Sequence, residues 1–301
     1  MLSFLPAWLR GFIAGFFLLI NTLLLAPLLI CVSLLRFIIP VQAWQRGCTA
    51  TAIAIAELWI SVNSLWMKLT QKMQWEVEGI EQLDKQHWYL VSSNHQSYAD
   101  IFILQHLLNR KIPMLKFFLK QQLIWVPVIG LCWWALDFPF MKRYSKEFLE
   151  KNPDKRGEDF ESTRRACEKF KHTPVTVFNF LEGTRFTPAK QQAQQSPYKW
   201  LLKPKAGGIA FVVGAMGDSL NALLDITIVY PGHKQPSFQD FLCGRVNNIQ
   251  VRVEQKTIPS QFLNKNYNED EQFRLEFQQW VSQLWQEKDE LITQLLPQDG
   301  D

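Results

Sequence analysis

A histidine and an aspartate stand five positions apart in VSSNHQSYADIFILQHLL (residues 91–108), between an apolar strand-like run and an apolar helix-like run. Across a strand-to-helix turn, the imidazole of His95 can fold back onto the carboxylate of Asp100. A carboxylate that accepts a hydrogen bond from one ring N–H leaves the other ring nitrogen free as a general base. The stretch therefore predicts a catalytic dyad, with Asn94 beside it, at the start of a helix.

The same residues also fit an ordinary helix start. Ser97 and Asp100 have the spacing of a capping box, with Ser97 as the N-cap and Asp100 at the third helical position. This interpretation explains Asp100 without catalysis, but it leaves His95 unexplained. Both interpretations stay open at this point.

A second polar group, Glu182-Gly183-Thr184-Arg185, follows an apolar run within TVFNFLEGTRF (residues 176–186). Ligands of open α/β sheets bind at the carboxyl ends of the strands. An arginine there can hold a phosphate through two parallel hydrogen bonds. The alternative is a plain turn with a surface Glu182–Arg185 pair.

Two further basic positions border apolar runs. Lys120 opens KQQLIWVPVIG (residues 120–130), and Lys142-Arg143 closes FPFMKR (residues 138–143). Neither segment has a functional meaning alone.

Short β-like runs alternate with helical ones beyond residue 70, which favours an α/β layered domain. The predicted strands are 87–93, 112–118, 174–180, 223–230 and 249–255. The predicted helices are 100–110, 158–172, 205–217 and 268–295, the last with Asn268 as its N-cap. The Gln-rich tract 189–199 is expected to be a loop.

The first 70 residues differ from the rest. Residues 12–35 carry no charge, and a bilayer core needs about 20 helical residues. Residues 47–67 have a polar stripe at helical spacing, typical of a helix that lies on a membrane or forms the second leg of a hairpin. We expect an anchor over residues 1–70 and a catalytic domain over residues 71–301. A buried hairpin in a soluble protein is the alternative.

The composition excludes some classes of function. A net charge of +4 is far from the basic stripe of a nucleic-acid-binding protein. Five scattered cysteines without a C-x-x-C pair indicate reduced thiols on the cytosolic side. No metal is expected, because neither the cysteines nor the remaining histidines form a ligand cluster; these histidines are His87, His106, His172 and His233.

Taken together and in order, these motifs resemble those of the PlsC-type lysophospholipid acyltransferases, also called 1-acylglycerol-3-phosphate acyltransferases. The resemblance covers about residues 70 to 260. It rests on N-H-x-x-x-x-D, on K-x-x-L-x-x-x-P-x-x-G, on an aromatic-rich run ending in arginine, on E-G-T-R, and on an apolar strand closing in proline. The matching positions are Asn94, His95 and Asp100; Lys120, Leu123, Pro127 and Gly130; residues 140–143; residues 182–185; and Pro231.

Within that family the chain looks like the bacterial YihG-like branch, and EGTRFTPAK is close to the form found in lysocardiolipin acyltransferases. One departure is plain. Leu181 stands where the common family form has proline, which affects the turn that leads into Glu182.

The resemblance implies the glycerolipid acyltransferase fold, a mixed and largely parallel sheet flanked by helices. It also implies a membrane-bound enzyme that moves an acyl chain from acyl-CoA or acyl-carrier protein to the free sn-2 hydroxyl of lysophosphatidic acid. His95 and Asp100 would be catalytic and would act without an acyl-enzyme. The implied substrate-binding residues are Asn94, Lys120, Arg143, Glu182, Gly183, Thr184 and Arg185.

The resemblance implies no cofactor beyond the acyl donor, which is a substrate. Lys203 and Lys205 are candidates for the phosphates of CoA, with a solvated loop as the alternative. The implied partners are the lysophospholipid, the acyl donor and membrane lipids, and no nucleic acid. The implied location is the bacterial inner membrane, with the catalytic domain facing the cytoplasm.

Other functions and substrates remain. The acceptor could instead be lysophosphatidylglycerol or lysocardiolipin. A non-catalytic membrane scaffold would have no need of the His95–Asp100 pair, and a lipid hydrolase that uses water would have no need of a phosphate clamp. Residues 12–67 could cross the bilayer once, cross it twice, or lie in one leaflet.

Overall fold

A six-stranded mixed sheet forms the centre of the protein. The computed structural model describes residues 2–141, 161, 167, 170, 173–232, 235–265, 267 and 270–296. The sheet strands are β1 (Gln74–Glu78), β2 (Tyr89–Ser93), β3 (Leu115–Phe117), β6 (Thr176–Phe180), β7 (Ala222–Val229) and β8 (Asn248–Lys256). Their spatial order is β1-β8-β7-β2-β6-β3.

Four neighbouring strands, β7, β2, β6 and β3, run parallel to one another. Strand β8 pairs antiparallel with β7, and β1 pairs parallel with β8. The predicted class, a largely parallel mixed sheet with flanking helices, is confirmed. The carboxyl ends of β2, β6 and β7 therefore meet at one edge of the sheet.

Burial explains which strands the sequence reveals. Every residue of β2 and β7 is buried, as expected for interior strands covered on both faces. Strand β1 (QWEVE) was not predicted. It lies at the edge, alternates between exposed and half-buried residues, and carries two glutamates that weaken its strand signal.

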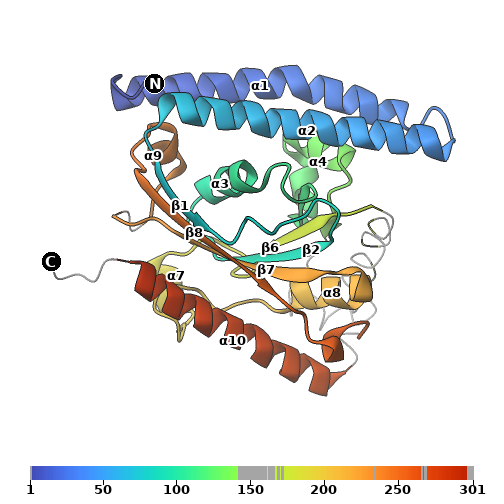
Figure 1. Ribbon diagram of the computed structural model, residues 1–301, viewed down its shortest axis with the longest axis vertical. Helices are drawn as coiled ribbons and strands as arrows, with labels where there is room; N and C mark the ends of the chain where they lie inside the picture. Colours follow the sequence, from blue (N-terminus) through green and yellow to red (C-terminus); the bar gives the residue numbers. More distant parts are fainter. Residues whose placement is uncertain are drawn as a thin grey trace.

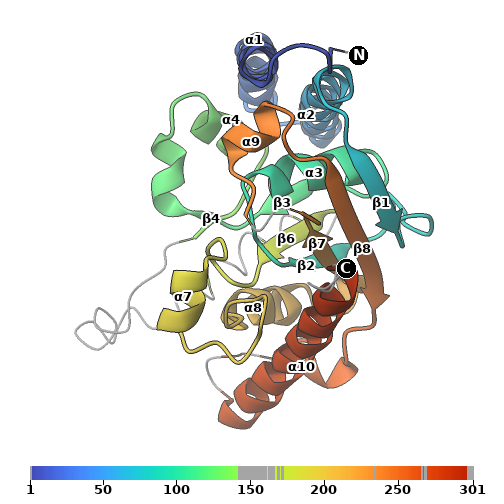
Figure 2. The same cartoon turned by 90° about the vertical axis from the view of Figure 1, so that its left-hand side faces the viewer.

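Helices cover both faces of the sheet (Figures 1 and 2). One face carries α3 (Ala99–Leu108), α9 (Phe238–Leu242) and the hairpin formed by α1 (Ala7–Leu35) and α2 (Gln42–Thr70). The other face carries α8 (Gly207–Met216) and α10 (Glu271–Leu295). Short 3-10 turns follow α8 and β8, namely η3 (Gly217–Ser219) and η4 (Ser260–Phe262).

Two helical details correct the sequence prediction. The N-cap of α10 is Asp270, whose carboxylate accepts from the backbone N–H of Phe273, and Asn268 lies outside the described residues. The tract expected to be a loop begins as helix α7 (Pro188–Ala193), because Thr187 caps it and proline suits the first helical position. Most of the predicted helix 158–172 also lies outside the described residues.

The hairpin is longer than predicted and largely uncovered. By length and composition both helices could cross a membrane, with mean hydropathies of 2.5 and 1.3 over their most apolar windows. Only 22% of that window in α1 is buried, so a fully buried hairpin does not fit the structure. A polar contact joins the two legs: the amide of Asn21 donates to the backbone oxygen of Trp59 and to Oδ1 of Asn63.

An insertion separates two very short strands next to this hairpin. Strands β4 (Leu119–Lys120) and β5 (Phe140–Met141) pair in parallel. Between them lie the 3-10 turn η1 (Gln121–Trp125) and helix α4 (Ile129–Ala135). We call residues 121–139 the β4–β5 insertion.

Candidate active site

The predicted dyad is formed in the structure. His95 follows the carboxyl end of β2, and Asp100 lies in the first turn of α3. The imidazole Nδ1 is 2.8 Å from Oδ2 of Asp100. Asp100 is fully buried, whereas 11% of the His95 side chain is exposed. The turn between strand and helix thus brings the imidazole back onto the carboxylate.

Asp100 accepts hydrogen bonds on both oxygens. Oδ2 also accepts from the backbone N–H groups of Gln96 and Ser97, at 2.8 and 3.0 Å. Oδ1 accepts from the hydroxyl of Tyr230, the residue that follows β7. Because the other three groups around this carboxylate are donors, His95 completes the set as an Nδ1–H donor, and Nε2 is then left with its lone pair.

Two groups around the dyad were not predicted as functional. Tyr230 is fully buried, and burial together with the charge of Asp100 raises its pKa well above the ordinary value. Phe180 stacks on the imidazole, with ring centroids 3.9 Å apart and planes 15° from parallel. The only sequence signal for Tyr230 was its place at the end of an apolar run before Pro231. A run of this kind predicts a buried strand and does not mark a functional residue.

The capping-box interpretation is correct only in part. The N-cap of α3 is Tyr98, without a side-chain cap, and the hydroxyl of Ser97 accepts from the N–H of Ala99 at 3.1 Å. The carboxylate half is present, since Asp100 accepts from the N–H of Ser97. Asp100 therefore stabilises the helix start and orients His95 at the same time.

Glu182 holds the backbone of the histidine. It is fully buried, and its two oxygens accept from the backbone N–H of His95 at 2.7 Å and of Leu202 at 3.0 Å. A surface Glu182–Arg185 pair is therefore excluded. Burial raises the pKa of Glu182 to about 8, although the two backbone hydrogen bonds favour its ionised form.

The turn after β6 meets His95 from two sides. The N–H of Phe186 donates to the backbone oxygen of His95 at 2.7 Å, which complements the bond from His95 to Glu182. Gly183 adopts a φ of +66°, a conformation that favours glycine. Leu181, which replaces the family proline, is buried, and its carbonyl accepts from the N–H of Lys205. The turn thus forms with leucine at this position.

Arg185 lies beside the dyad segment. Its guanidinium stands over the ring of Tyr98, 3.8 Å from the centroid. Within the described part of the chain it pairs with no carboxylate. Lys190, on α7, donates to the hydroxyl of Thr184 and to the backbone oxygen of Arg185, both at 2.9 Å. Lys190 was not predicted, because the tract containing it was expected to be a loop.

The remaining predicted site residues lie in different surroundings. Asn94 is fully buried, and its side-chain amide both donates to and accepts from the backbone of Ile228 on β7, at 2.8 and 2.9 Å. Lys120 is exposed at the end of β4, and no hydrogen bond or ion pair joins it to the dyad within the described residues. Arg143 lies outside the described residues.

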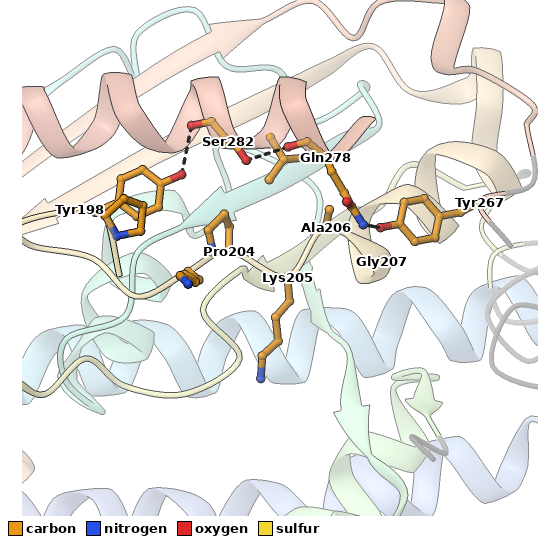
Figure 3. Close-up of a pocket in the computed structure, with 11 residues that line it drawn as sticks. Tyr198, Pro204, Lys205, Ala206, Gly207, Tyr267, Gln278 and Ser282 are labelled. Atoms are coloured by element: carbon orange, nitrogen blue, oxygen red, sulfur yellow. Dashed lines mark hydrogen bonds between the residues drawn. The ribbon is translucent and has the colours of Figure 1, made fainter. Parts of the chain in front are cut away.

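A cavity of about 560 Å³ lies between the segment before α8 and helix α10 (Figure 3). Its wall includes Tyr198, whose hydroxyl donates to the backbone oxygen of Ser282, and Lys203. The side chain of Lys205 extends away from the tyrosines in Figure 3. Its Nζ is 3.0 Å from where a Cβ on Gly183 would lie, so this ammonium group stands beside the E-G-T-R turn.

In the described ranges, no group of three or more His, Cys, Asp or Glu side chains could hold a metal ion. The arrangement present is a buried carboxylate, an imidazole with one open nitrogen, and an arginine beside it. Such a site can remove a proton from a hydroxyl group next to a bound anion.

The acyltransferase family model matches residues 74–230, just over half of the chain. The chain therefore belongs to the acyltransferase family. The matched region contains His95, Asp100, Glu182 and Tyr230. The resemblance read from the motifs is confirmed at the level of the family, and the bacterial branch stays a prediction.

Several characterised proteins are similar to this chain. The human protein "1-acyl-sn-glycerol-3-phosphate acyltransferase gamma" is 25% identical over 251 residues, which cover 76% of this chain and 61% of the relative. Chicken "Lysocardiolipin acyltransferase 1" is 25% identical over 272 residues, covering 86% and 65%. The yeast "2-acyl-1-lysophosphatidylinositol acyltransferase" is 25% identical over 245 residues, covering 66% and 59%. The chain thus spans about three fifths of the length of these relatives.

A solved structure, that of PlsC from Thermotoga maritima, a 1-acyl-sn-glycerophosphate acyltransferase, aligns with 91% of this chain and 97% of its own. The identity is 16% and the TM-score is 0.49.

Proposed function

We propose that this protein is a membrane-bound acyltransferase that moves a fatty acyl chain from acyl-CoA or acyl-carrier protein to the sn-2 hydroxyl of lysophosphatidic acid. The observation that carries the proposal is the His95–Asp100 contact at 2.8 Å beside the E-G-T-R turn. The names of the relatives support the same reaction class and differ in the acceptor lipid.

In the proposed reaction, Nε2 of His95 takes the proton of the acceptor hydroxyl while the oxygen attacks the thioester carbonyl. A bond forms between that oxygen and the acyl carbon, and the carbon–sulfur bond breaks. The thiol leaves with the proton that His95 has held. Asp100 stabilises the imidazolium that exists between these two transfers.

Arg185 is the proposed ligand of the acceptor phosphate. Stacking on Tyr98 restricts its guanidinium, and its lack of a carboxylate partner in the described chain leaves its donors for an anion. Lys120 and Arg143 are proposed to assist at the same headgroup. Glu182 is proposed to act through its bond from the backbone N–H of His95. Asn94, the residue before His95, is proposed to act through its bonds to the backbone of Ile228 on β7.

The proposed location is the inner membrane of a bacterium, with the catalytic domain on the cytoplasmic side. Two helices with largely uncovered apolar residues suggest a membrane protein. Cytoplasmic acyl-CoA and acyl-carrier protein require the His95 side of the sheet to be reachable from the cytoplasm.

The test is acyl transfer from labelled acyl-CoA by solubilised full-length protein, with lysophosphatidic acid, lysophosphatidylglycerol and lysocardiolipin as acceptors. His95→Ala is expected to lower the rate by about a hundredfold or more, because general acid–base catalysis contributes about 10²–10⁴-fold. His87→Ala is the matched control. It removes a partly exposed histidine before β2, and its rate should stay near that of the unmodified protein.

Each contrary result has a meaning. Release of free fatty acid that depends on His95, without transfer to any acceptor, would favour a hydrolase. Equal inactivity of the unmodified protein and the variant with both kinds of donor would favour a non-catalytic scaffold. A trapped acyl-enzyme would exclude direct transfer.

A further inference from the structure

The β4–β5 insertion exposes a run of apolar residues at its tip. Trp125 is 84% exposed, and Val126 and Val128 are more than a third exposed. On the following helix, Leu131 and Trp134 are also exposed. Consecutive exposed apolar residues are unfavourable in water, and a contiguous patch of this kind marks an interaction surface.

The tip is held in a costly conformation. Val128, the N-cap of α4, has a φ of +64°, which a β-branched residue rarely adopts. Gly130 follows, and a Cβ there would lie 2.2 Å from the backbone oxygen of Ile124, so the turn needs glycine. Such strain persists where the surroundings enforce it and concentrates at functional segments.

Three contacts fix the insertion against the C-terminal end of α1. Arg36 forms an ion pair with Asp137 at 2.5 Å, and the hydroxyl of Ser33 donates to the backbone oxygen of Ala135. Phe37 stacks on Trp134 with centroids 6.0 Å apart. Figure 2 shows α4 beside α1, on the side of the sheet that carries the hairpin.

The apolar surface of the insertion is therefore continuous with that of the hairpin. Beyond the stacked Phe37, which is itself exposed, lie further exposed apolar side chains: Leu34, Leu35, Ile38, Ile39 and Val41. Of the two described helices that are long and apolar enough to cross a membrane, α1 is the more apolar. A single planar, non-polar partner can cover the exposed apolar residues of the β4–β5 insertion and of α1 at the same time.

We propose that the β4–β5 insertion is a second membrane-contacting element, which places Trp125 and its neighbours in the interfacial layer of a phospholipid bilayer next to α1. This inference rests on the proposed function. Tryptophan favours the membrane interface, where its ring is apolar and its N–H remains hydrated. Lys120 is exposed at the end of β4, directly before the insertion, so immersion of the tip brings this basic residue to the level of the lipid headgroups.

The first experiment is photocrosslinking of the full-length protein in vesicles of phosphatidylethanolamine and phosphatidylglycerol that contain a diazirine phospholipid. We expect crosslinks within residues 124–134 as well as on α1. Crosslinks on α1 alone would overturn the proposal. A second copy of the chain as the occupant would also overturn it, and would appear as a concentration-dependent dimer that is lost in Trp125→Ser. Crosslinking requires no turnover, so this result is independent of the proposed function.

The second experiment compares Trp125→Ser with Leu275→Ser, which changes an exposed apolar residue on α10, on the opposite face of the sheet. With long-chain lysophosphatidic acid in vesicles, Trp125→Ser should raise the apparent KM about tenfold and leave kcat unchanged, since burial of a large apolar side chain contributes about that factor. With a short-chain, monomeric acceptor in water, both variants should match the unmodified protein.

An equal loss with both forms of the acceptor would overturn the membrane role. Inactivity of every variant and of the unmodified protein would instead count against the proposed function. Because Trp125 is so exposed, its replacement removes little packing, and circular dichroism of each variant checks the fold.

Discussion

At the scale of single residues, the site depends on one buried carboxylate that serves three purposes. Asp100 accepts from the backbone N–H of Ser97 at the start of α3, from Nδ1 of His95, and from the hydroxyl of Tyr230. An unpaired oxygen on a buried carboxylate is costly. Every donor around Asp100 therefore influences how strongly it holds the imidazolium.

Tyr230→Phe removes one of those donors. Oδ1 of Asp100 then lies buried without its donor, and the carboxylate that orients His95 is held less firmly. We expect kcat to fall about tenfold or more, in line with the ~1.5–3 kcal/mol of a hydrogen bond to a charged group, with little change in KM. An unchanged kcat would contradict this role.

Tyr89→Phe is the matched control for that experiment. The hydroxyl of Tyr89 is also buried within the sheet, but it accepts from the N–H of Asp84, away from the dyad. Its loss should affect stability without lowering kcat.

Glu182 gives a prediction about stability. Its pKa is about 8 in the folded protein against an ordinary 4.5. The unfolded chain loses this proton as pH rises through 4.5, while the folded protein keeps it until about pH 8. This group therefore makes the free energy of unfolding fall as pH rises through that window, by up to ~1.4 kcal/mol per pH unit.

Glu182→Gln should remove that slope. Chemical denaturation between pH 5 and pH 8 should show that the free energy of unfolding of the variant rises relative to that of the unmodified protein as pH rises. Glu78→Gln, at an exposed carboxylate of β1, should leave the slope as it is. Parallel slopes for Glu182→Gln and the unmodified protein would contradict the raised pKa.

At the scale of elements, the site is assembled where β2, β6 and β7 end at one edge of the sheet. In the turn after β6, the N–H of Phe186 donates to the backbone oxygen of His95, and the carboxylate of Glu182 accepts from the backbone N–H of His95. The turn after β7 supplies Tyr230 to Asp100. Because these bonds run between elements, a change in one turn is transmitted to the histidine.

Gly183→Ala tests this coupling. A side chain at a φ of +66° costs about 1 kcal/mol or more, and relaxation of the turn should displace Glu182 and lower kcat. Gly244→Ala is the matched control, since Gly244 has a φ of +65° and its Cβ would likewise meet the flexible end of a basic side chain. It should cost similar stability in thermal unfolding but no activity, and equal activity of the two variants would exclude the coupling.

At the scale of the whole molecule, the sheet joins two different surfaces. The hairpin covers one face, and α10 covers the other (Figure 1). Lys288 of α10 is fully buried and reaches β7, where Nζ is 3.0 Å from Oδ1 of Asp225 and 2.8 Å from the backbone oxygen of Ile226. This contact ties α10 to the strand that leads to Tyr230.

Lys288→Met should destabilise the protein by about 3–5 kcal/mol, because it leaves the carboxylate of Asp225 buried without its cation. Denaturant unfolding of the solubilised protein measures this change. The double variant Lys288→Met with Asp225→Leu should recover most of the loss. Equal destabilisation of the single and double variants would mean that packing, and not the unpaired charge, is responsible.

Much of this fold was predictable because its interior strands are continuous apolar runs. β2, β6 and β7 were placed within a few residues, since strands that are largely buried leave that pattern in the sequence. β8 was placed equally well, because buried apolar residues alternate along it with less buried polar ones. β1 was missed because an edge strand need not be apolar. The two-residue strands β4 and β5 were missed because their pairing depends on where the β4–β5 insertion packs.

The sequence by itself determined the residue types of the site and the order in which the chain presents them. His95, Asp100 and Glu182–Arg185 were identified from the ordered set of motifs and the family resemblance that it carries, and a local turn fixes how near His95 and Asp100 can come. Only the tertiary structure decided that Tyr230 completes the carboxylate, that Phe180 stacks on the imidazole, and that Glu182 holds the backbone of His95. These contacts join residues between 85 and 130 positions apart, and they depend on which strands are neighbours in the sheet and not on local periodicity.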